Sequence, residues 1–388
     1  MKVLFVSYGC PSVMYPVNGV FQFDQAKALR SAGIDVAFAA IDLRSIRKWR
    51  KWGLHSFSRD DIPIFEMNIP LGPFPDCLLE KFGRSGFSAI YRHVEKAWGR
   101  PDIIHAHFGE TAAYTTGVIR KEHLPLLLTE HSSRLNSPSP QRELHKRLRP
   151  VYDMAEKIIA VSNALACNIE KWYGRKPAVV PNMVDLKLFL HGDRSLSDHM
   201  TFRFVTCSNL VTTKGHDFLL RAFSAILLEH SNCSLTIWGD GVERKRLEGL
   251  AEFLGCAGNV TFKGRADRRT IAADYHTADA FILASKTETF GIVFIEAMAA
   301  GLPVIATACG GPEDFVNDRN GILVPVNDSE ALENAMLEMI SNIRKYDRNK
   351  IAMETANRFS PQTIAGQLIA TYYDVLYGQM EVRSSDAK

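Results

Sequence analysis

At 388 residues the chain exceeds what one hydrophobic core usually supports, so we expect two domains. Its composition, with 46% hydrophobic and 23% charged residues, is that of a globular protein. Seven scattered cysteines without a C-x-x-C pair argue for a reducing compartment and against a structural zinc site. The first residues lack the features of a signal peptide, and charged and helix-breaking residues interrupt the longest apolar stretch, Gly291–Gly311. We therefore expect a cytoplasmic protein without a transmembrane helix.

The net charge of +3 is unevenly distributed along the chain. Residues 1–190 contain 26 Lys and Arg against 18 Asp and Glu, whereas the remainder contains 20 against 25. Much of the excess lies in the segment Arg44–Trp52, R-S-I-R-K-W-R-K-W, where five cations alternate with two tryptophans. Basic residues with tryptophans suit an anionic membrane surface, and the other interpretation is a solvated basic loop. No recognition motif for nucleic acid accompanies them.

Strand and helix patterns alternate along the first half of the chain. Amphipathic stretches such as Gln22–Ala32 predict helices. Apolar runs predict strands at Lys2–Tyr8, Asp35–Ile41, Ile103–His107, Leu126–Thr129 and Lys157–Val161.

The second half repeats the alternation. Its apolar runs predict strands at Phe202–Cys207, Ser234–Trp238, Asn259–Phe262, Ala280–Leu283, Pro303–Ala306 and Gly321–Val324. Strands that alternate with helices imply a parallel sheet covered on both faces. Two such units in tandem predict an α/β chain of two doubly wound, Rossmann-like domains, with a ligand cleft where the carboxyl ends of the strands face each other.

The domain boundary is expected near V-V-P-N-M-V-D, before a polar stretch. We predict an acceptor-binding domain over residues 1–184 and a nucleotide-sugar-binding domain over residues 185–360. A last helix at 361–377 is expected to cross back to the first domain. Residues 378–388 read as a disordered tail.

Two carboxylates flank a glycine turn in the window K-T-E-T-F-G-I-V-F-I-E-A-M-A-A-G. If a helix begins near Gly291, its first backbone amides are unpaired and can bind a diphosphate. Glu288 precedes this seat and Glu296 lies inside the helix, roughly 7 Å further along it. One carboxylate could bind hydroxyls of a sugar and the other hydroxyls of a nucleoside. The alternative is a solvated loop glutamate beside an ordinary helix glutamate.

Three more polar side chains follow strands of the second half. Lys214 opens a helix after the first strand, where a cation can meet phosphate, although a surface lysine would look the same. Asp240 in W-G-D-G and Arg265 in F-K-G-R-A-D follow the next two strands. Their common position at strand ends predicts that all three border the cleft.

Histidines follow two strands of the first half. His105 and His107 point the same way on a strand, so a metal pair is conceivable. No third ligand and no Asp-x-Asp triplet is evident, and we expect His107 in the cleft, His105 packed below it, and no metal. His131, in T-E-H-S, is a rival for contact with the acceptor.

The ordered motifs of the second half resemble those of the retaining GT-B glycosyltransferases of family 4. They run N-L-V-T-T-K-G-H-D, L-T-I-W-G-D-G, F-K-G, A-D-A-F-I-L-A-S, E-T-F-G-I-V-F-I-E-A-M-A-A-G-L-P-V-I-A-T, G-G-P-E-D-F-V and G-I-L-V-P. The long block carries the family's Glu-x7-Glu signature at Glu288 and Glu296. In the first half, N-G-V-F-Q-F-D-Q-A-K-A-L, I-H-A-H-F-G-E, T-E-H-S, A-V-S-N-A-L and V-P-N-M-V-D resemble the family's looser landmarks.

This resemblance implies a role for each site residue. Glu296 would hold the ribose of a nucleotide sugar, Glu288 the donor sugar, and Lys214 the diphosphate. The amides that meet the diphosphate or sugar would be those of Phe290, Gly291 and Ile292. Gly19 matches the glycine at which the backbone approaches the phosphate. His107 matches the histidine placed beside the reacting centre.

One position departs from the family pattern. Many members carry arginine five positions before the lysine, and here that position is Asn209. Asparagine cannot neutralise phosphate, so Lys214 is expected to be the main cation, helped by Arg265. The departure puts donor affinity in doubt more than the class of reaction.

The resemblance implies transfer of a hexosyl unit from a nucleoside diphosphate sugar, with UDP favoured, to a hydroxyl of a glycan or lipid-linked acceptor. Anomeric configuration would be retained, no metal or other cofactor would be required, and the product would serve cell-surface polysaccharide or glycolipid synthesis. Two alternatives remain. A sugar-nucleotide epimerase or a phosphorylase could use a similar fold. A catalytically idle nucleotide-sugar-binding subunit is the other, and Asn209 is its best support.

Overall fold

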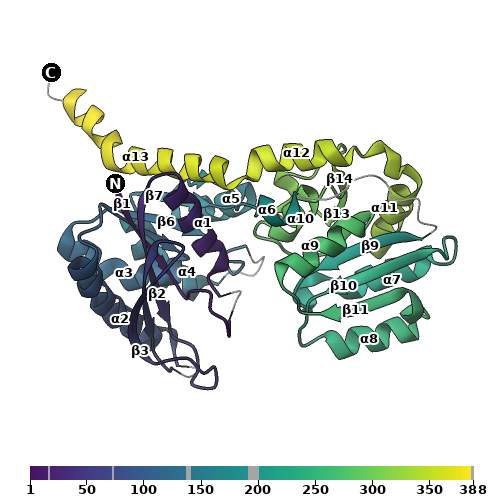
Figure 1. Cartoon of the computed structure of the whole chain (residues 1–388), viewed down its shortest axis with the longest axis horizontal. Coiled ribbons are helices and arrows are strands. Elements are labelled where there is room, and N and C mark those ends of the chain that lie inside the picture. The colour runs from purple at the N-terminus through teal and green to yellow at the C-terminus, as the bar shows by residue number, and fades with distance from the viewer. Residues whose placement is uncertain (16–17, 72–73, 137–140, 191–200, 386–388) are drawn as a thin grey trace. The chain divides into compact units, whose positions relative to one another are not determined.

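The chain consists of two α/β units in a computed structural model that describes residues 1–15, 18–71, 74–136, 141–190 and 201–385 (Figure 1). The first unit comprises Met1–Asn182 together with Pro361–Lys388, and the second comprises Met183–Ser360. Each is built round one mostly parallel sheet. The prediction of two doubly wound, Rossmann-like sheets with a C-terminal helix on the first is confirmed.

Within the described residues, the first unit holds an eight-stranded sheet in the order β3-β4-β2-β1-β5-β6-β7-β8. All neighbours are parallel except β3 and β4. Strands β1, β2 and β5 are almost wholly buried, because parallel strands are covered by helices on both faces. The strands are β1 (Lys2–Ser7), β2 (Asp35–Asp42), β3 (Gly53–Arg59), β4 (Ile62–Asn68), β5 (Ile103–His107), β6 (Leu126–Glu130), β7 (Lys157–Ala160) and β8 (Ala178–Val179).

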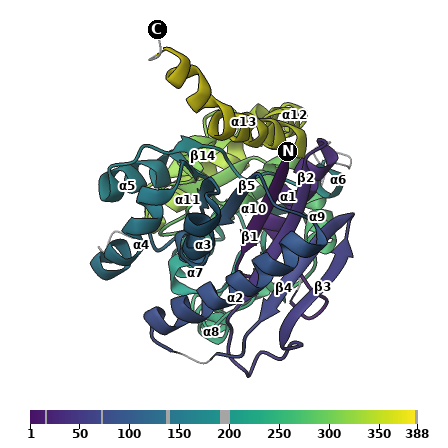
Figure 2. The ribbon, with the colours of Figure 1, turned by 90° about the vertical axis from the view of Figure 1, so that its left-hand side faces the viewer.

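Helices cover both faces of this sheet. They are α1 (Val20–Ser31), α2 (Asp76–Ala97), α3 (Gly109–Glu122), α4 (Arg142–Met154), α5 (Asn163–Tyr173) and α13 (Pro361–Ser385). Figure 2 shows α2 crossing in front of the strands, and it contacts β2 and β4. On the other side α1 packs beside α13.

The C-terminal helix α13 is fixed to the first unit by buried and charged contacts. Tyr372 is fully buried, and its hydroxyl lies 2.7 Å from His105 Nδ1. Lys157 forms an ion pair of 3.0 Å with Asp374. The helix continues to Ser385, past the Tyr377 at which the sequence pattern predicts its end, so Gly378 does not stop it. The remainder of the expected tail, 386–388, lies outside the described residues.

The hairpin β3–β4 is absent from the predicted elements. Its two strands pair antiparallel from Gly53 opposite Asn68 to Arg59 opposite Ile62. Asp60 and Asp61 close the turn, both with positive φ. Most of β3 is exposed, so its sequence lacks the apolar run that marks the buried strands.

The second unit holds, in its described residues, a six-stranded and wholly parallel sheet in the order β11-β10-β9-β12-β13-β14. The order reverses between β9 and β12, and ligands of doubly wound sheets bind at such a reversal, outside the carboxyl ends of the strands. The strands are β9 (Phe202–Cys207), β10 (Cys233–Trp238), β11 (Val260–Gly264), β12 (Ala280–Leu283), β13 (Val304–Thr307) and β14 (Gly321–Val324).

The helices in the described residues of this unit are α6 (Leu186–Phe189), α7 (His216–Ile226), α8 (Arg244–Phe253), α9 (Arg268–Thr277), α10 (Ile292–Ala299), α11 (Ser329–Asn342) and α12 (Arg348–Phe359). Four of them, α7 to α10, connect successive strands, whereas α6 precedes the sheet and α11 and α12 follow it. Short 3₁₀ helices interrupt the loops, among them η1 (Thr212–Lys214) directly after β9. Among all the described residues, no helix combines the length and apolar character that a bilayer crossing requires.

Candidate functional site

A lysine and a glutamate meet at the point where the strand order of the second unit reverses. Lys214 ends η1, which follows β9, and Glu288 lies in the loop after β12. Lys214 Nζ lies 2.6 Å from Glu288 Oε1, and Ser285 Oγ donates to the same oxygen at 2.7 Å. Glu288 is only 7% exposed, whereas 23% of the Lys214 side chain is exposed. The carboxylate is therefore held in place, while the cation reaches solvent at the sheet edge.

The backbone at Gly215 brings these two side chains together. Gly215 has a φ of 64°, and a Cβ built on it would lie 1.9 Å from the carbonyl oxygen of Ala284. Any other residue would push η1 away from the end of β12. In the same place Lys286 N donates to Thr213 O at 2.8 Å. The loops after β9 and β12 are thus joined through their backbones, and Lys214 is set opposite Glu288.

The N terminus of α10 opens three residues after Glu288. Gly291 caps it in the left-handed conformation, and no side chain caps its first amides. Two backbone hydrogen bonds join this loop to the loop after β13, since Gly311 N donates to Glu288 O and Glu288 N donates to Cys309 O. Phe290 is 3% exposed and anchors the turn. A helix start with uncapped amides beside a lysine is a suitable seat for an anion.

Glu296 lies in the middle of α10 and is 6% exposed. Its Oε1 is 3.4 Å from Nε of Arg268, the first residue of α9. Burial, and after it the nearby Glu296 carboxylate, raise the pKa of Cys207, the last residue of β9, to about 12. Glu296 is therefore close to the end of β9. Glu296 thus lies behind the same sheet edge as Lys214, with an arginine as its partner.

Arg268 is a site residue that the sequence reading missed. Asp267 caps α9 by accepting a hydrogen bond from Thr270 N at 2.8 Å, which places Arg268 in the first turn. The signal was present, since R-A-D-R-R contains an N-cap aspartate followed by arginine. Arg265, which the sequence predicts at the cleft, is exposed in the loop after β11.

The other predicted donor residues lie along the same edge of the sheet. Asn209 follows β9 and is exposed. Asp240 follows β10, and its Oδ1 accepts a hydrogen bond from Gly241 N at 2.8 Å, so it shapes its own turn. The loops are in backbone contact here as well, since Leu210 N donates to Asp240 O.

In the first unit, the two histidines predicted to contact the substrates lie against each other. His107 ends β5 and His131 follows β6, and His107 Nδ1 lies 3.0 Å from His131 Nε2. Burial lowers the pKa of His107 well below its usual range and that of His131 to about 4, so both rings are neutral at pH 7. His107 Nε2 is buried and has no hydrogen-bond partner among the described residues. His105, in contrast, lies within 2.7 Å of both Tyr372 and Thr129.

Glu130 connects the loops that carry these histidines, and the sequence reading missed it. It is fully buried, and its oxygens accept hydrogen bonds at 2.9 Å each from the backbone amides of Gly109, His131 and Ser132. The Tyr152 hydroxyl donates a fourth at 2.5 Å. Burial raises the pKa of Glu130 to about 7, and the hydrogen bonds oppose that rise. A glutamate directly after the apolar run, as the central residue of T-E-H, was the available signal.

Gly19 lies at the start of α1 with a φ of 70°. A Cβ there would lie 2.1 Å from Gly9 O, so the loops after β1 themselves require glycine. The predicted close approach of a phosphate is thus not the only reason for glycine at this position.

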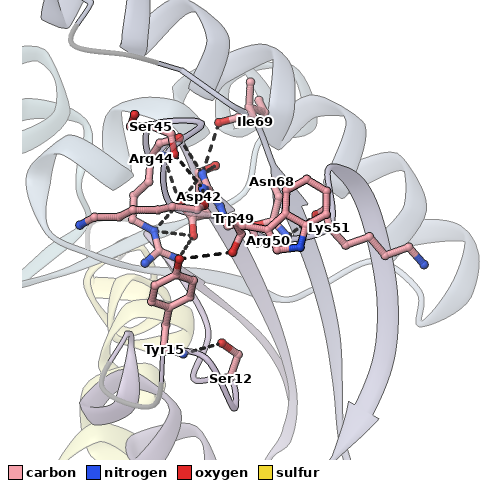
Figure 3. Close-up of polar contacts among 11 residues, drawn as sticks. Ser12, Tyr15, Asp42, Arg44, Ser45, Trp49, Arg50, Lys51, Asn68 and Ile69 are labelled. Atoms are coloured by element: carbon pink, nitrogen blue, oxygen red, sulfur yellow. Dashed lines mark hydrogen bonds and ion pairs between the residues drawn. The ribbon is translucent and has the colours of Figure 1, made fainter.

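The cationic segment Arg44–Trp52 differs from its expected form. Arg44 and Arg50 both pair with Asp42, the buried last residue of β2, and Arg50 is only 9% exposed (Figure 3). Arg50 also donates to the carbonyl oxygens of Lys48, Arg44 and Ile69. The expectation of five surface cations is therefore wrong for these two arginines, because both form ion pairs with Asp42 inside the loop.

Among the described residues, no group of three or more His, Cys, Asp or Glu side chains is arranged to hold a metal ion.

Two family models match consecutive parts of the chain. The model described as Glycosyltransferase Family 4 matches residues 19–188, and the model described as Glycosyl transferases group 1 matches residues 193–357. A D-inositol 3-phosphate glycosyltransferase of Segniliparus rotundus is 28% identical over 83% of this chain and 79% of its own. The putative teichuronic acid biosynthesis glycosyltransferase TuaC of Bacillus subtilis is 25% identical over 90% of each chain.

Solved structures show the same fold. The sucrose-phosphate synthase from Thermosynechococcus elongatus has a TM-score of 0.80 at 22% identity, covering 97% of this chain and 99% of its own. The Anabaena protein HepE in complex with UDP and glucose has a TM-score of 0.74 at 20% identity, covering 96% and 100%.

Replacing Glu130 by Gln tests the connection between the histidine loops. Whichever way the new amide turns, at least one buried backbone N–H loses its acceptor. We expect the free energy of unfolding, measured by urea denaturation, to fall by about 2–4 kcal/mol. The matched change Glu143→Gln, on the exposed face of α4, should stay within about 0.5 kcal/mol of the parent. Equal stability of the two variants would contradict the role of Glu130.

Proposed function

Because this chain belongs to the family 4 (group 1) glycosyltransferases, a retaining family with the GT-B fold, we propose that it transfers a hexosyl unit from a UDP-sugar with retention of configuration. The proposed acceptor is a hydroxyl of a glycan or lipid-linked molecule, in cell-surface polysaccharide or glycolipid synthesis. The observation that carries the proposal is the Lys214–Glu288 pair beside the uncapped start of α10. A cation, a fixed carboxylate and a row of amides there suit a sugar diphosphate.

The departing nucleoside diphosphate gains negative charge as the glycosidic bond breaks. In the proposed reaction the first amides of α10 and the ammonium of Lys214 stabilise that charge. Lys214 has three N–H donors, so it can contact a phosphate while it still holds Glu288. Because contacts with Glu288 fix the position of the ammonium, little reorganisation is needed when charge develops.

In this proposal the two carboxylates bind the two sugar rings of the donor. Glu288, fixed by Lys214 and Ser285, accepts hydrogen bonds from hydroxyls of the transferred sugar. Glu296 accepts those of the ribose, with Arg268 as its charged neighbour. A glycosidase would need its two carboxylates on either side of the scissile bond, which a ribose-bound Glu296 does not provide.

The first unit supplies neutral groups. We assign His107 to the reacting sugar and His131 to the acceptor, joined by their 3.0 Å contact. Their lowered pKa values keep both rings uncharged at neutral pH, so they act as hydrogen-bonding groups. The domain assignment follows, with residues 185–360 binding the nucleotide sugar and residues 1–184 the acceptor.

Turnover of labelled donors by the purified chain tests the function. Among UDP-, GDP- and ADP-hexoses, a UDP-sugar should give the largest thermal stabilisation and be consumed in the presence of an acceptor. Consumption should continue in EDTA, since Lys214 and α10 hold the leaving group. Binding without turnover would favour the idle subunit, an isomerised nucleotide sugar would favour the epimerase, and loss in EDTA restored by Mg²⁺ would contradict the metal-free mechanism.

Lys214→Ala should lower kcat/KM for the donor strongly. Loss of one preorganised charge-stabilising group costs on the order of 3 kcal/mol of transition-state stabilisation, or about a hundredfold. Arg265→Ala removes an exposed cation from the loop after β11 and should cost less. Steady-state kinetics of both variants give the comparison. Parent-like activity of Lys214→Ala would rule out its role at the diphosphate.

Glu296→Gln should raise KM for the donor more than it lowers kcat. A ribose clamp acts equally in the ground state and the transition state, so its loss weakens binding uniformly. Arg268→Gln, which removes the partner and keeps the carboxylate, should raise KM less. If kcat alone falls in Glu296→Gln, the ribose assignment is wrong.

A further inference from the structure

The loop after β2 carries exposed apolar and cationic side chains on neighbouring residues. We call this set the Trp49 patch, and it consists of Ile46, Arg47, Lys48, Trp49 and Lys51. All five are exposed, with 66% of Ile46 and 61% of Trp49 accessible to solvent. None of its three cations forms an ion pair with a described residue. Exposed apolar side chains that gather with one another and with cations mark an interaction surface, whereas single ones need no explanation.

Contacts on the inner side of the loop hold it in place, and the Trp49 ring packs against that of Trp52 at 5.4 Å. Asp42 binds the guanidinium groups of Arg44 and Arg50 on the inner side, as Figure 3 shows. Arg50 further ties the loop to Ile69 O, and Asn68 donates to Lys51 O at 2.9 Å. The inner arginines thus support the loop, and the outer cations keep their charge for a partner.

A second segment adds apolar surface beside the patch. The Tyr15 hydroxyl donates to Trp49 O at 3.3 Å, and the Arg44 guanidinium lies 4.2 Å from the centre of the Tyr15 ring. Tyr15 closes a turn with Ser12, and the two residues between them, Val13 and Met14, are exposed. The surface therefore combines exposed apolar side chains from two segments with three cations.

We propose that the Trp49 patch docks the first unit on an anionic lipid bilayer. Tryptophan and aliphatic side chains partition into the interfacial region of a bilayer, and Lys and Arg are attracted to acidic headgroups. Charge complementarity selects anionic lipid, and the exposed Trp49 and Ile46 select a bilayer over a soluble anion. The patch follows the carboxyl end of β2, and His107 lies at the carboxyl end of β5 in the same sheet. Under the proposed function, docking would bring that sheet edge to a lipid-linked acceptor.

Sedimentation with vesicles measures docking without any turnover, so its outcome is independent of the proposed reaction. The chain should sediment with phosphatidylcholine vesicles that contain phosphatidylserine, less so as salt rises, and not with phosphatidylcholine alone. The variant Arg47→Ser/Lys48→Ser/Lys51→Ser should bind about a hundredfold more weakly, about fivefold for each cation. Trp49→Ser should also weaken binding, and the blue shift of tryptophan emission on vesicles should disappear with it.

The control variant removes the same amount of charge near the opposite ends of the strands, where their amino termini lie. Arg92, Lys96 and Arg120 are exposed near the carboxyl ends of α2 and α3, which lead into the amino ends of β5 and β6. Their triple serine variant should bind vesicles like the parent. Equal loss in both triple variants, or no sedimentation of the parent with either lipid, would overturn the proposal. So would full competition by millimolar inorganic phosphate at constant ionic strength, which would assign the patch to a soluble anion.

Discussion

The ion pair between Lys214 and Glu288 spans the reversal of strand order in the second unit, and it depends on one backbone approach. Gly215 lies so close to Ala284 O that a Cβ would overlap it. That contact sets the distance between the loop after β9, which carries the cation, and the loop after β12, which carries the carboxylate and leads into α10. The positions of the cation, the carboxylate and the helix amides are therefore coupled through this one contact. A side chain at position 215 would disturb them together.

Buried strands were the predictable part of the fold. Ala280–Leu283 and Ile103–His107 are wholly buried, and their apolar runs predicted the observed bounds. The start of α10 was also predictable, because Gly291 precedes a long apolar helix. The β3–β4 hairpin was not predictable in this way, since β3 is half-exposed and its turn uses two aspartates with positive φ in place of Asn-Gly. An apolar run indicates a buried strand, so an exposed strand such as β3 cannot be predicted from one.

Charged residues were harder to place, because a sequence does not show which charges face each other. Arg44 and Arg50 looked like surface cations, yet Asp42 at the end of a buried strand binds both. Glu130 also ends a buried strand and binds the amides of neighbouring loops. In each case the last residue of a parallel strand organises the loop that follows. A carboxylate directly after an apolar run is the common signal, and both predicted strands end one residue before it, at Ile41 and Thr129.

The groups proposed to meet the donor differ in charge between the two units, and the difference suits the proposed reaction. The second unit keeps ionised pairs at its sheet edge, where a diphosphate would need fixed positive charge. The first unit buries His107 and His131 until both rings are neutral. Positive charge develops on the sugar as the glycosidic bond breaks. A protonated histidine beside that sugar would repel it, whereas a neutral ring can accept or donate a hydrogen bond without this cost. Under the proposed function, burial of the histidine pair would serve the chemistry as well as the packing of the strand ends.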